Sequence, residues 1–242
     1  MSYLQQNHFR SFVTAFVFAF AVVGVLFSAL PARAQTSVNL FTDPGFESNP
    51  LGTFVGVFSG TQNVWGAENG SIVGTTGSIT PLGSKMLQML DDGLTVTQTA
   101  QLVAVPTAFV PSIDAGNTTV DMSAFFNVTA NAPNAVGSVL VEFLDGSAAS
   151  LGFLSNNSSS LGPNGLDVNS LTWENVLLDN APVPSLTRFL RAQVLYNNAS
   201  MAGNPGFVDN ADLRISIVPE PSTFALAALG LVGMGWRRRK RA

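Results

Sequence analysis

The feature that most limits the fold of this chain is a period-two alternation of apolar and polar residues. It recurs in four segments, at residues 120–128, 139–143, 190–196 and 213–217. Successive side chains of a strand point to opposite faces, so each segment predicts a strand with one buried face and one solvated face. Clusters of Gly, Asn and Asp separate the segments, and no amphipathic helix longer than two turns is evident. The pattern predicts an all-β fold, a single β-sandwich of the jelly-roll type.

The N-terminal end is expected to be a targeting segment rather than part of the sandwich. Residues 12–30 are almost wholly apolar, and Ala32-Arg33-Ala34 follows with the small-x-small pattern that signal peptidase cuts. We therefore expect a signal peptide over residues 1–34, cleaved after Ala34. An uncleaved membrane anchor is the alternative, because the apolar run is nearly long enough to span a bilayer.

The predicted sandwich domain, residues 35–217, is strongly acidic. It holds fourteen Asp and Glu residues against four Lys and Arg, so its net charge is near −10. A nucleic-acid partner requires a basic surface that neutralises phosphates. Nucleic acid is therefore not expected among the partners of the domain.

The same domain contains neither cysteine nor histidine, since His8 lies in the signal peptide. This excludes Ser-His-Asp and Cys-His catalysis and the usual transition-metal ligands. A glycosidase that uses a pair of carboxylates remains possible, but no such pair here lies in a distinctive motif. We predict a domain that is not an enzyme.

Two short motifs near the ends of the domain resemble those of a known fold. Residues 39–47 (NLFTDPGFE) and 207–213 (FVDNADL) are similar to the first and last strands of galactose-binding-like jelly rolls. Many carbohydrate-binding modules have this fold. The resemblance implies that Glu47 and Asp209 meet at a structural Ca²⁺ ion, whose shell backbone carbonyls complete. The alternative is that both acids bond only local turns.

The resemblance also directs attention to aromatic side chains, since such modules stack exposed aromatic rings on sugars. Trp65 follows a stretch rich in Gly, Ser, Thr and Asn, and is the candidate for ligand stacking. Burial in the core is the alternative for Trp65, because buried aromatic residues are common.

The last twenty-five residues, 218–242, form three consecutive elements. The motif Val218-Pro219-Glu220-Pro221-Ser222 is followed by an apolar run over residues 223–236 and then by Arg237, Arg238, Arg239, Lys240 and Arg241. As a helix the apolar run would reach only ~21 Å, short of the ~30 Å hydrocarbon core. The basic cluster is expected to stay cytoplasmic, which leaves the domain outside.

This order of elements resembles the PEP-CTERM sorting signal of exopolysaccharide-producing Gram-negative bacteria. The resemblance implies an exosortase as processing partner and an inner-membrane precursor with a short transmembrane helix. We therefore expect an exported protein of the cell surface or extracellular matrix, associated with exopolysaccharide and structural or glycan-binding in role. The alternative function is a carbohydrate-active enzyme, or a soluble glycan-binding module released after processing.

Overall fold

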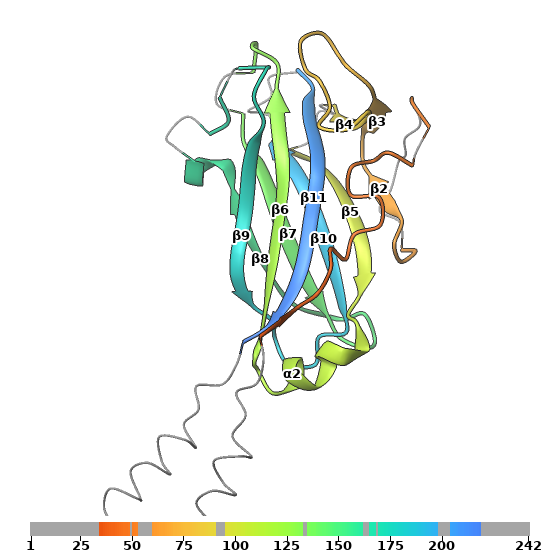
Figure 1. Ribbon diagram of the computed structural model, residues 1–242, viewed down its shortest axis with the longest axis vertical. Helices are drawn as coiled ribbons and strands as arrows, with labels where there is room; N and C mark the ends of the chain where they lie inside the picture. The colour runs from red at the N-terminus through yellow and green to blue at the C-terminus, as the bar shows by residue number, and fades with distance from the viewer. Residues whose placement is uncertain are drawn as a thin grey trace, which may run out of the picture. The chain divides into compact units, whose positions relative to one another are not determined.

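The computed structural model describes residues 34–48, 50–52, 60–90, 95–132, 135–161, 165–167, 169–197 and 204–218 (Figure 1). The expected signal peptide up to Arg33, the transmembrane helix and the sorting segment from Pro219 onward lie outside these ranges. Residues Gln35–Val218 form one compact unit. Within the described ranges, no helix has the length and apolar character needed to cross a membrane.

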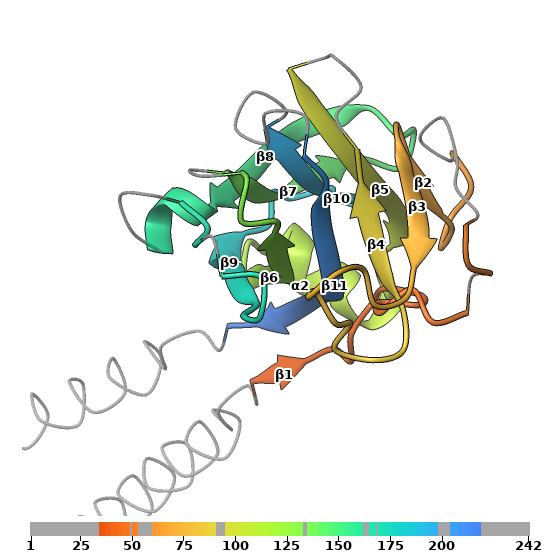
Figure 2. The same cartoon turned by 90° about the horizontal axis from the view of Figure 1, so that it is seen from above.

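The described strands form two antiparallel sheets, which appear as separate layers when the molecule is viewed along the strands (Figure 2). The first sheet has the order β3 (Gly70–Val73), β4 (Met86–Met89), β11 (Gly206–Ile217), β6 (Thr118–Val128), β9 (Glu174–Pro182), with β1 (Gln35–Thr36) paired to β11. The second has the order β2 (Trp65–Ala67), β5 (Val96–Ala104), β10 (Phe189–Asn197), β7 (Gly137–Leu144), β8 (Ser150–Asn157). The short helices are η1 (Thr107–Phe109), α2 (Val110–Asp114) and η2 (Ser158–Leu161). The predicted all-β sandwich is confirmed.

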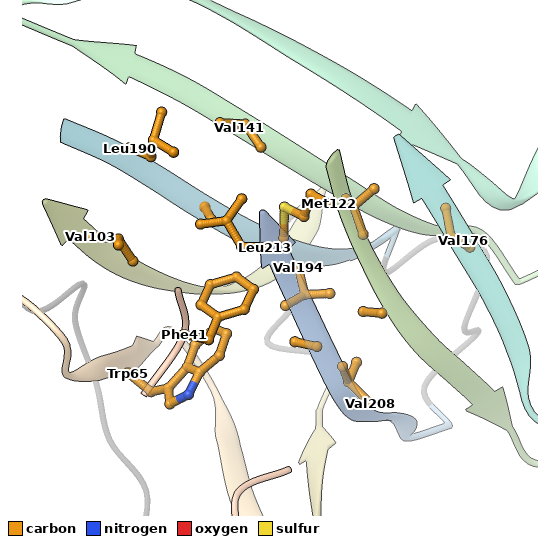
Figure 3. Packing of buried hydrophobic residues seen from close by; sticks show 14 of the residues in the cluster. Phe41, Trp65, Val103, Met122, Val141, Val176, Leu190, Val194, Val208 and Leu213 are labelled. Atoms are coloured by element: carbon orange, nitrogen blue, oxygen red, sulfur yellow. The ribbon is translucent and has the colours of Figure 1, made fainter. Parts of the chain in front are cut away.

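The core lies between the sheets and includes the apolar positions that the alternation predicted. Leu190 and Val194 of β10 face Met122 and Leu213 of the other sheet, and all four are fully buried (Figure 3). Burial of such side chains is the main favourable term in folding. Tyr196 is also fully buried, and its hydroxyl donates to the carbonyl oxygens of Asn127 (2.9 Å) and Phe207 (2.8 Å).

Two strands depart from the predicted pattern. In β5 the inward positions include Thr99 and Gln101, which are fully buried and bond main-chain groups of other segments. In β8 every residue but one is exposed, because this strand lies at the edge of its sheet. The polar, low-complexity stretch over residues 155–169 is typical of a loop, but its first residues, Ser155–Asn157, end β8.

The first residues of the domain lie along the last part of β11. Gln35 pairs with Ile217, and the main-chain N–H groups of Ser37 and Leu40 donate to Ile215 and Leu213 (both 2.8 Å). The segment after the expected signal cleavage site therefore fills the side of β11 that β4 leaves open further along the strand. The two ends of the domain are neighbours in one sheet.

Candidate functional site

The outer face of the second sheet carries a mixed row of side chains in register. Because Leu190 and Val141 point into the core (Figure 3), the residues next to them in sequence point outward. We call the following four residues, directly opposite one another on β5, β10, β7 and β8, the outer row: Leu102, Arg191, Glu142, Phe153. With strands ~4.8 Å apart, the outer row extends over ~14 Å.

The centre of the outer row is an ion pair between adjacent strands. Nη1 of Arg191 donates to Oε2 of Glu142 at 2.7 Å, and the two side chains are 41% and 19% exposed. Cross-strand pairs of opposite charge stabilise a sheet modestly. The Arg191–Glu142 pair also holds a guanidinium and a carboxylate in fixed positions. Both groups keep further hydrogen-bond donors and acceptors that a ligand can use.

The end of the outer row is an exposed aromatic ring. Phe153 on β8 is 64% exposed, which is high for a side chain of this size within a strand. Phe153 was not predicted from the sequence, because β8 shows no period-two alternation. One sequence feature could have indicated a strand with an exposed aromatic residue here. Phe153 lies between Gly152 and the polar residues Ser155–Asn157, in a segment without turn-forming Pro or Asp.

A second row lies beside the first and adds uncharged polar groups. Gln193 on β10 stands between Ala100 of β5 and Leu140 of β7, and Leu140 is opposite Ser155 of β8. Among the described residues, the side-chain amide of Gln193 has no hydrogen-bond partner. At the β2 end of the sheet, Nε2 of Gln98 donates to Oε1 of Glu68 (2.8 Å).

These groups suit a ligand that has an apolar face and a rim of hydroxyl groups. An aromatic ring covers apolar C–H surface, while a free amide and a fixed guanidinium–carboxylate pair can both donate to and accept from hydroxyls. A pyranose ring has both properties. The face holds no histidine or cysteine.

Trp65, which the sequence put forward for ligand stacking, is not available for it. Its side chain is 7% exposed and packs on Phe41 and Phe46, with ring centroids 4.8 and 5.2 Å away. The indole N–H donates to the carbonyls of Thr42 and Asp43, both at 3.0 Å. The prediction of an exposed Trp65 is wrong, because the segment before β2 folds its own aromatic residues over the indole.

Glu47 and Asp209, the predicted calcium ligands, do lie near each other. The N–H of Leu82 donates to Oδ2 of Asp209 (2.8 Å), and those of Ser84 and Lys85 donate to Oε1 of Glu47 (2.7 and 3.0 Å). One loop therefore holds both carboxyl groups. A Cβ atom on Gly83 would collide with the Glu47 carboxylate, so a side chain at this position would displace that carboxylate from its place against the loop.

The two carboxyl groups of the Glu47–Asp209 pair titrate differently. Asp209 has no exposed surface, and burial raises its pKa to about 6, with a further contribution from the charge of Glu47. The pKa of Glu47 is lowered, first by the hydroxyl of Ser84 and then by the Lys85 amide. Glu47 is thus stabilised in its charged form, whereas Asp209 is destabilised in its charged form.

The carboxylate oxygens of this pair are the kind of ligand atom that Ca²⁺ binds. Both side chains offer hard oxygen atoms, each with lone pairs beyond the hydrogen bonds described. A cation would also offset the repulsion between Glu47 and Asp209. Two carboxylates do not fill a shell of six to eight oxygens, and no group of three or more acidic residues able to hold a metal occurs in the described part of the chain. Main-chain carbonyls would have to complete the shell.

A second carboxyl pair, Asp167 and Glu174, was not predicted from the sequence. Both carboxylate oxygens of Glu174 are shielded from solvent and have no hydrogen-bond partner in the described structure. Burial, together with the adjacent carboxylate of Asp167, raises the pKa of Glu174 to about 8. Asp167 itself accepts hydrogen bonds from the N–H of Asn169 (2.7 Å) and the hydroxyl of Thr172 (3.2 Å).

The C-terminal segment was compared with protein-family models. Residues 218–240 match the PEP-CTERM protein-sorting motif. The chain carries a PEP-CTERM sorting signal. The match includes the predicted residues 218–222 and all of the basic cluster except Arg241, and it indicates an exported protein with a C-terminal anchoring signal. Of the matched residues the structure describes only Val218, whose N–H donates to the carbonyl of Asn117 (2.9 Å).

Solved structures similar to the domain include carbohydrate-binding modules. The TmCBM61 module in complex with β-1,4-galactotriose is 16% identical with a TM-score of 0.41, covering 73% of this chain and 98% of the module. The CBM22-1 xylan-binding domain from Paenibacillus barcinonensis Xyn10C is 14% identical (TM-score 0.41, coverage 65% and 88%).

A Stig cyclase, Fisc from Fischerella sp. TAU, is likewise similar: it is 13% identical with a TM-score of 0.49, and the comparison covers 76% of this chain and all of the cyclase. Values this low assign neither a substrate nor an activity to this chain. The comparison with curated proteins gave no match.

Proposed function

We propose that this protein is a non-enzymatic glycan-binding protein of the cell surface or extracellular matrix, and that the outer face of the β2-β5-β10-β7-β8 sheet is its binding site. The observation that carries the proposal is the outer row, in which an exposed Phe153 lies in register with the Arg191–Glu142 ion pair. The PEP-CTERM sorting signal supports an exported destination, and exopolysaccharide is the glycan that we propose as its ligand there.

Binding without turnover is supported by the positions of the acidic residues. A glycosidase needs two carboxyl groups on either side of an accessible sugar bond, one of them with a raised pKa. Glu174 and Asp209 both have raised pKa values, but the carboxylate oxygens of Glu174 are shielded from solvent and Asp209 has no exposed surface, so a substrate cannot reach them. On the outer face, Glu142 is held by Arg191.

The proposal extends to two partners of the chain. An exosortase is the enzyme that would recognise residues 218–222 and process the precursor at the inner membrane. A Ca²⁺ ion held by Glu47 and Asp209 would join the start of the domain to its last strand and stabilise the fold. The ion would have no catalytic role.

Glycan binding is tested with the fragment Gln35–Val218, which contains all of the described core. Calorimetry against neutral and acidic polysaccharides should show binding to at least one, with no release of reducing ends. Phe153→Ala and Arg191→Ala should each weaken binding about tenfold, or ~1.4 kcal/mol, because each removes a central contact.

Two substitutions on the other sheet serve as matched controls. Leu177 on β9 is 43% exposed, and Arg214 on β11 pairs with Asp212 at 2.7 Å, the same distance as the Arg191–Glu142 pair. Leu177→Ala and Arg214→Ala should leave affinity unchanged. Binding to no glycan, or equal losses in the control variants, would refute the outer face as the site, and turnover would show an enzyme.

A further inference from the structure

The charges of the domain restrict which glycan the outer face can take. The four basic residues of the domain all have partners on the domain itself. Three of them form ion pairs: Arg188 with Asp114, Arg191 with Glu142, Arg214 with Asp212. The ammonium group of Lys85 donates to the main-chain carbonyl of Glu47 at 2.7 Å. No cation in the described part of the chain is left without a partner to receive an anionic sugar.

The outer face itself has an excess of negative charge. Arg191 is balanced by Glu142, and Glu68 adds a further carboxylate beside Gln98. A uronate, sulfate or phosphate on the ligand would compete with Glu142 for the Arg191 guanidinium, and the nearby Glu142 carboxylate would repel it. Weakening the ion pair would also leave the largely buried Glu142 carboxylate less well compensated, which is unfavourable.

The electrostatic field of the whole domain also disfavours an anionic ligand. With a net charge near −10, the domain repels a polyanion at long range and lowers its local concentration at the surface. The groups left for recognition are uncharged or internally neutralised: the ring of Phe153, the amide of Gln193 and the Arg191–Glu142 pair. All of these suit hydroxyl groups and C–H faces.

We propose that the ligand of the outer face is a neutral polysaccharide, made of sugars without carboxylate, sulfate or phosphate groups. This inference rests on the proposed glycan-binding function and specifies its substrate class. Because no net charge is neutralised on binding, affinity should change less than about twofold between low and physiological salt, in contrast with the steep dependence of charge-driven binding.

The test compares neutral β-1,4-galactan and xylan with polygalacturonate and a sulfated galactan. All measurements on the fragment Gln35–Val218 contain a chelator, so that divalent cations cannot bridge two anions. The neutral polymers should bind with little salt dependence, and the anionic polymers should not bind. Tighter binding of an anionic polymer, falling as salt rises, would overturn the inference while leaving the glycan-binding function intact. Absence of binding to every polymer would instead defeat the proposed function.

A near-isosteric substitution that removes one negative charge makes the test sharper. Glu142→Gln releases Arg191, so the variant should gain measurable, salt-sensitive binding to polygalacturonate. The matched control is Asp212→Asn, which releases Arg214 on the other sheet and should gain none. Equal gains in both variants would show that overall charge, and not the outer face, selects the ligand; this result would also overturn the inference.

Discussion

The Glu47–Asp209 pair and the Asp167–Glu174 pair are built from the same groups but are supported very differently. The Glu47–Asp209 pair accepts hydrogen bonds from the main-chain N–H groups of Leu82, Ser84 and Lys85. At the other pair, Glu174 accepts none from the described residues. The supply of donors, and not the proximity of two acids alone, therefore decides which pair is a stable structural element and which one is under strain.

The largest effect is expected from Asp209→Ala. The substitution removes a fully buried carboxyl group and leaves the N–H groups of Leu82 and Asn210 without their acceptor. Measured by urea unfolding in chelator, the free energy of unfolding should fall by about 2–3 kcal/mol. Glu47→Gln, at the exposed member of the pair, should cost clearly less. Equal losses would show that the Leu82–Lys85 loop does not depend on the buried acid.

Calcium should distinguish the two pairs from each other. If Glu47 and Asp209 hold Ca²⁺, a hundredfold excess over the dissociation constant stabilises the fold by ~2.7 kcal/mol. The melting temperature should then rise on adding Ca²⁺, and Asp209→Ala should abolish the rise. Asp167→Asn should leave it intact. A melting curve of the unaltered domain that does not respond to Ca²⁺ would remove the metal from the Glu47–Asp209 pair.

The sequence predicted one of these pairs and missed the other, for a physical reason. Glu47 and Asp209 each lie in a short motif at an end of the domain, and the resemblance of both motifs to a known jelly roll brought them together. Glu174 acquires its raised pKa from burial at the start of β9 and from Asp167 in a preceding loop. No local pattern encodes that meeting, because it depends on how the loop folds onto the sandwich.

The strands also differ in how well the sequence predicts them. In β10 the alternation is complete, since apolar Leu190 and Val194 face the core, and the strand could be predicted. In β5 the inward positions include Thr99 and Gln101, which bond the carbonyl groups of Gly66 and Thr42. Buried polar residues that satisfy the backbone of other segments remove the hydrophobic period. Such a strand cannot be recognised from the sequence pattern alone.

The smallest effect is expected at the Asp167–Glu174 pair, and its sign depends on pH. The pKa of Glu174 is about 8 in the folded protein and 4.5 ordinarily, so the folded state holds this proton more tightly than the unfolded state. The contribution of Glu174 to stability is therefore complete below pH 4.5 and is lost as the pH rises to 8. Glu174→Gln should raise the free energy of unfolding by about 1 kcal/mol above pH 8. It should change little at pH 4.

Asp145 offers a control of opposite sign for this last experiment. Its carboxylate accepts from the hydroxyl and N–H of Ser147 and from the N–H of Ala149, which together lower its pKa. A lowered pKa stabilises the fold above the unfolded value and ceases to do so as the pH falls. Asp145→Asn should therefore destabilise the domain at neutral pH and have little effect in acid. If both variants show the same pH dependence, the general charge of this acidic domain, and not the missing donors around Glu174, sets its response to pH.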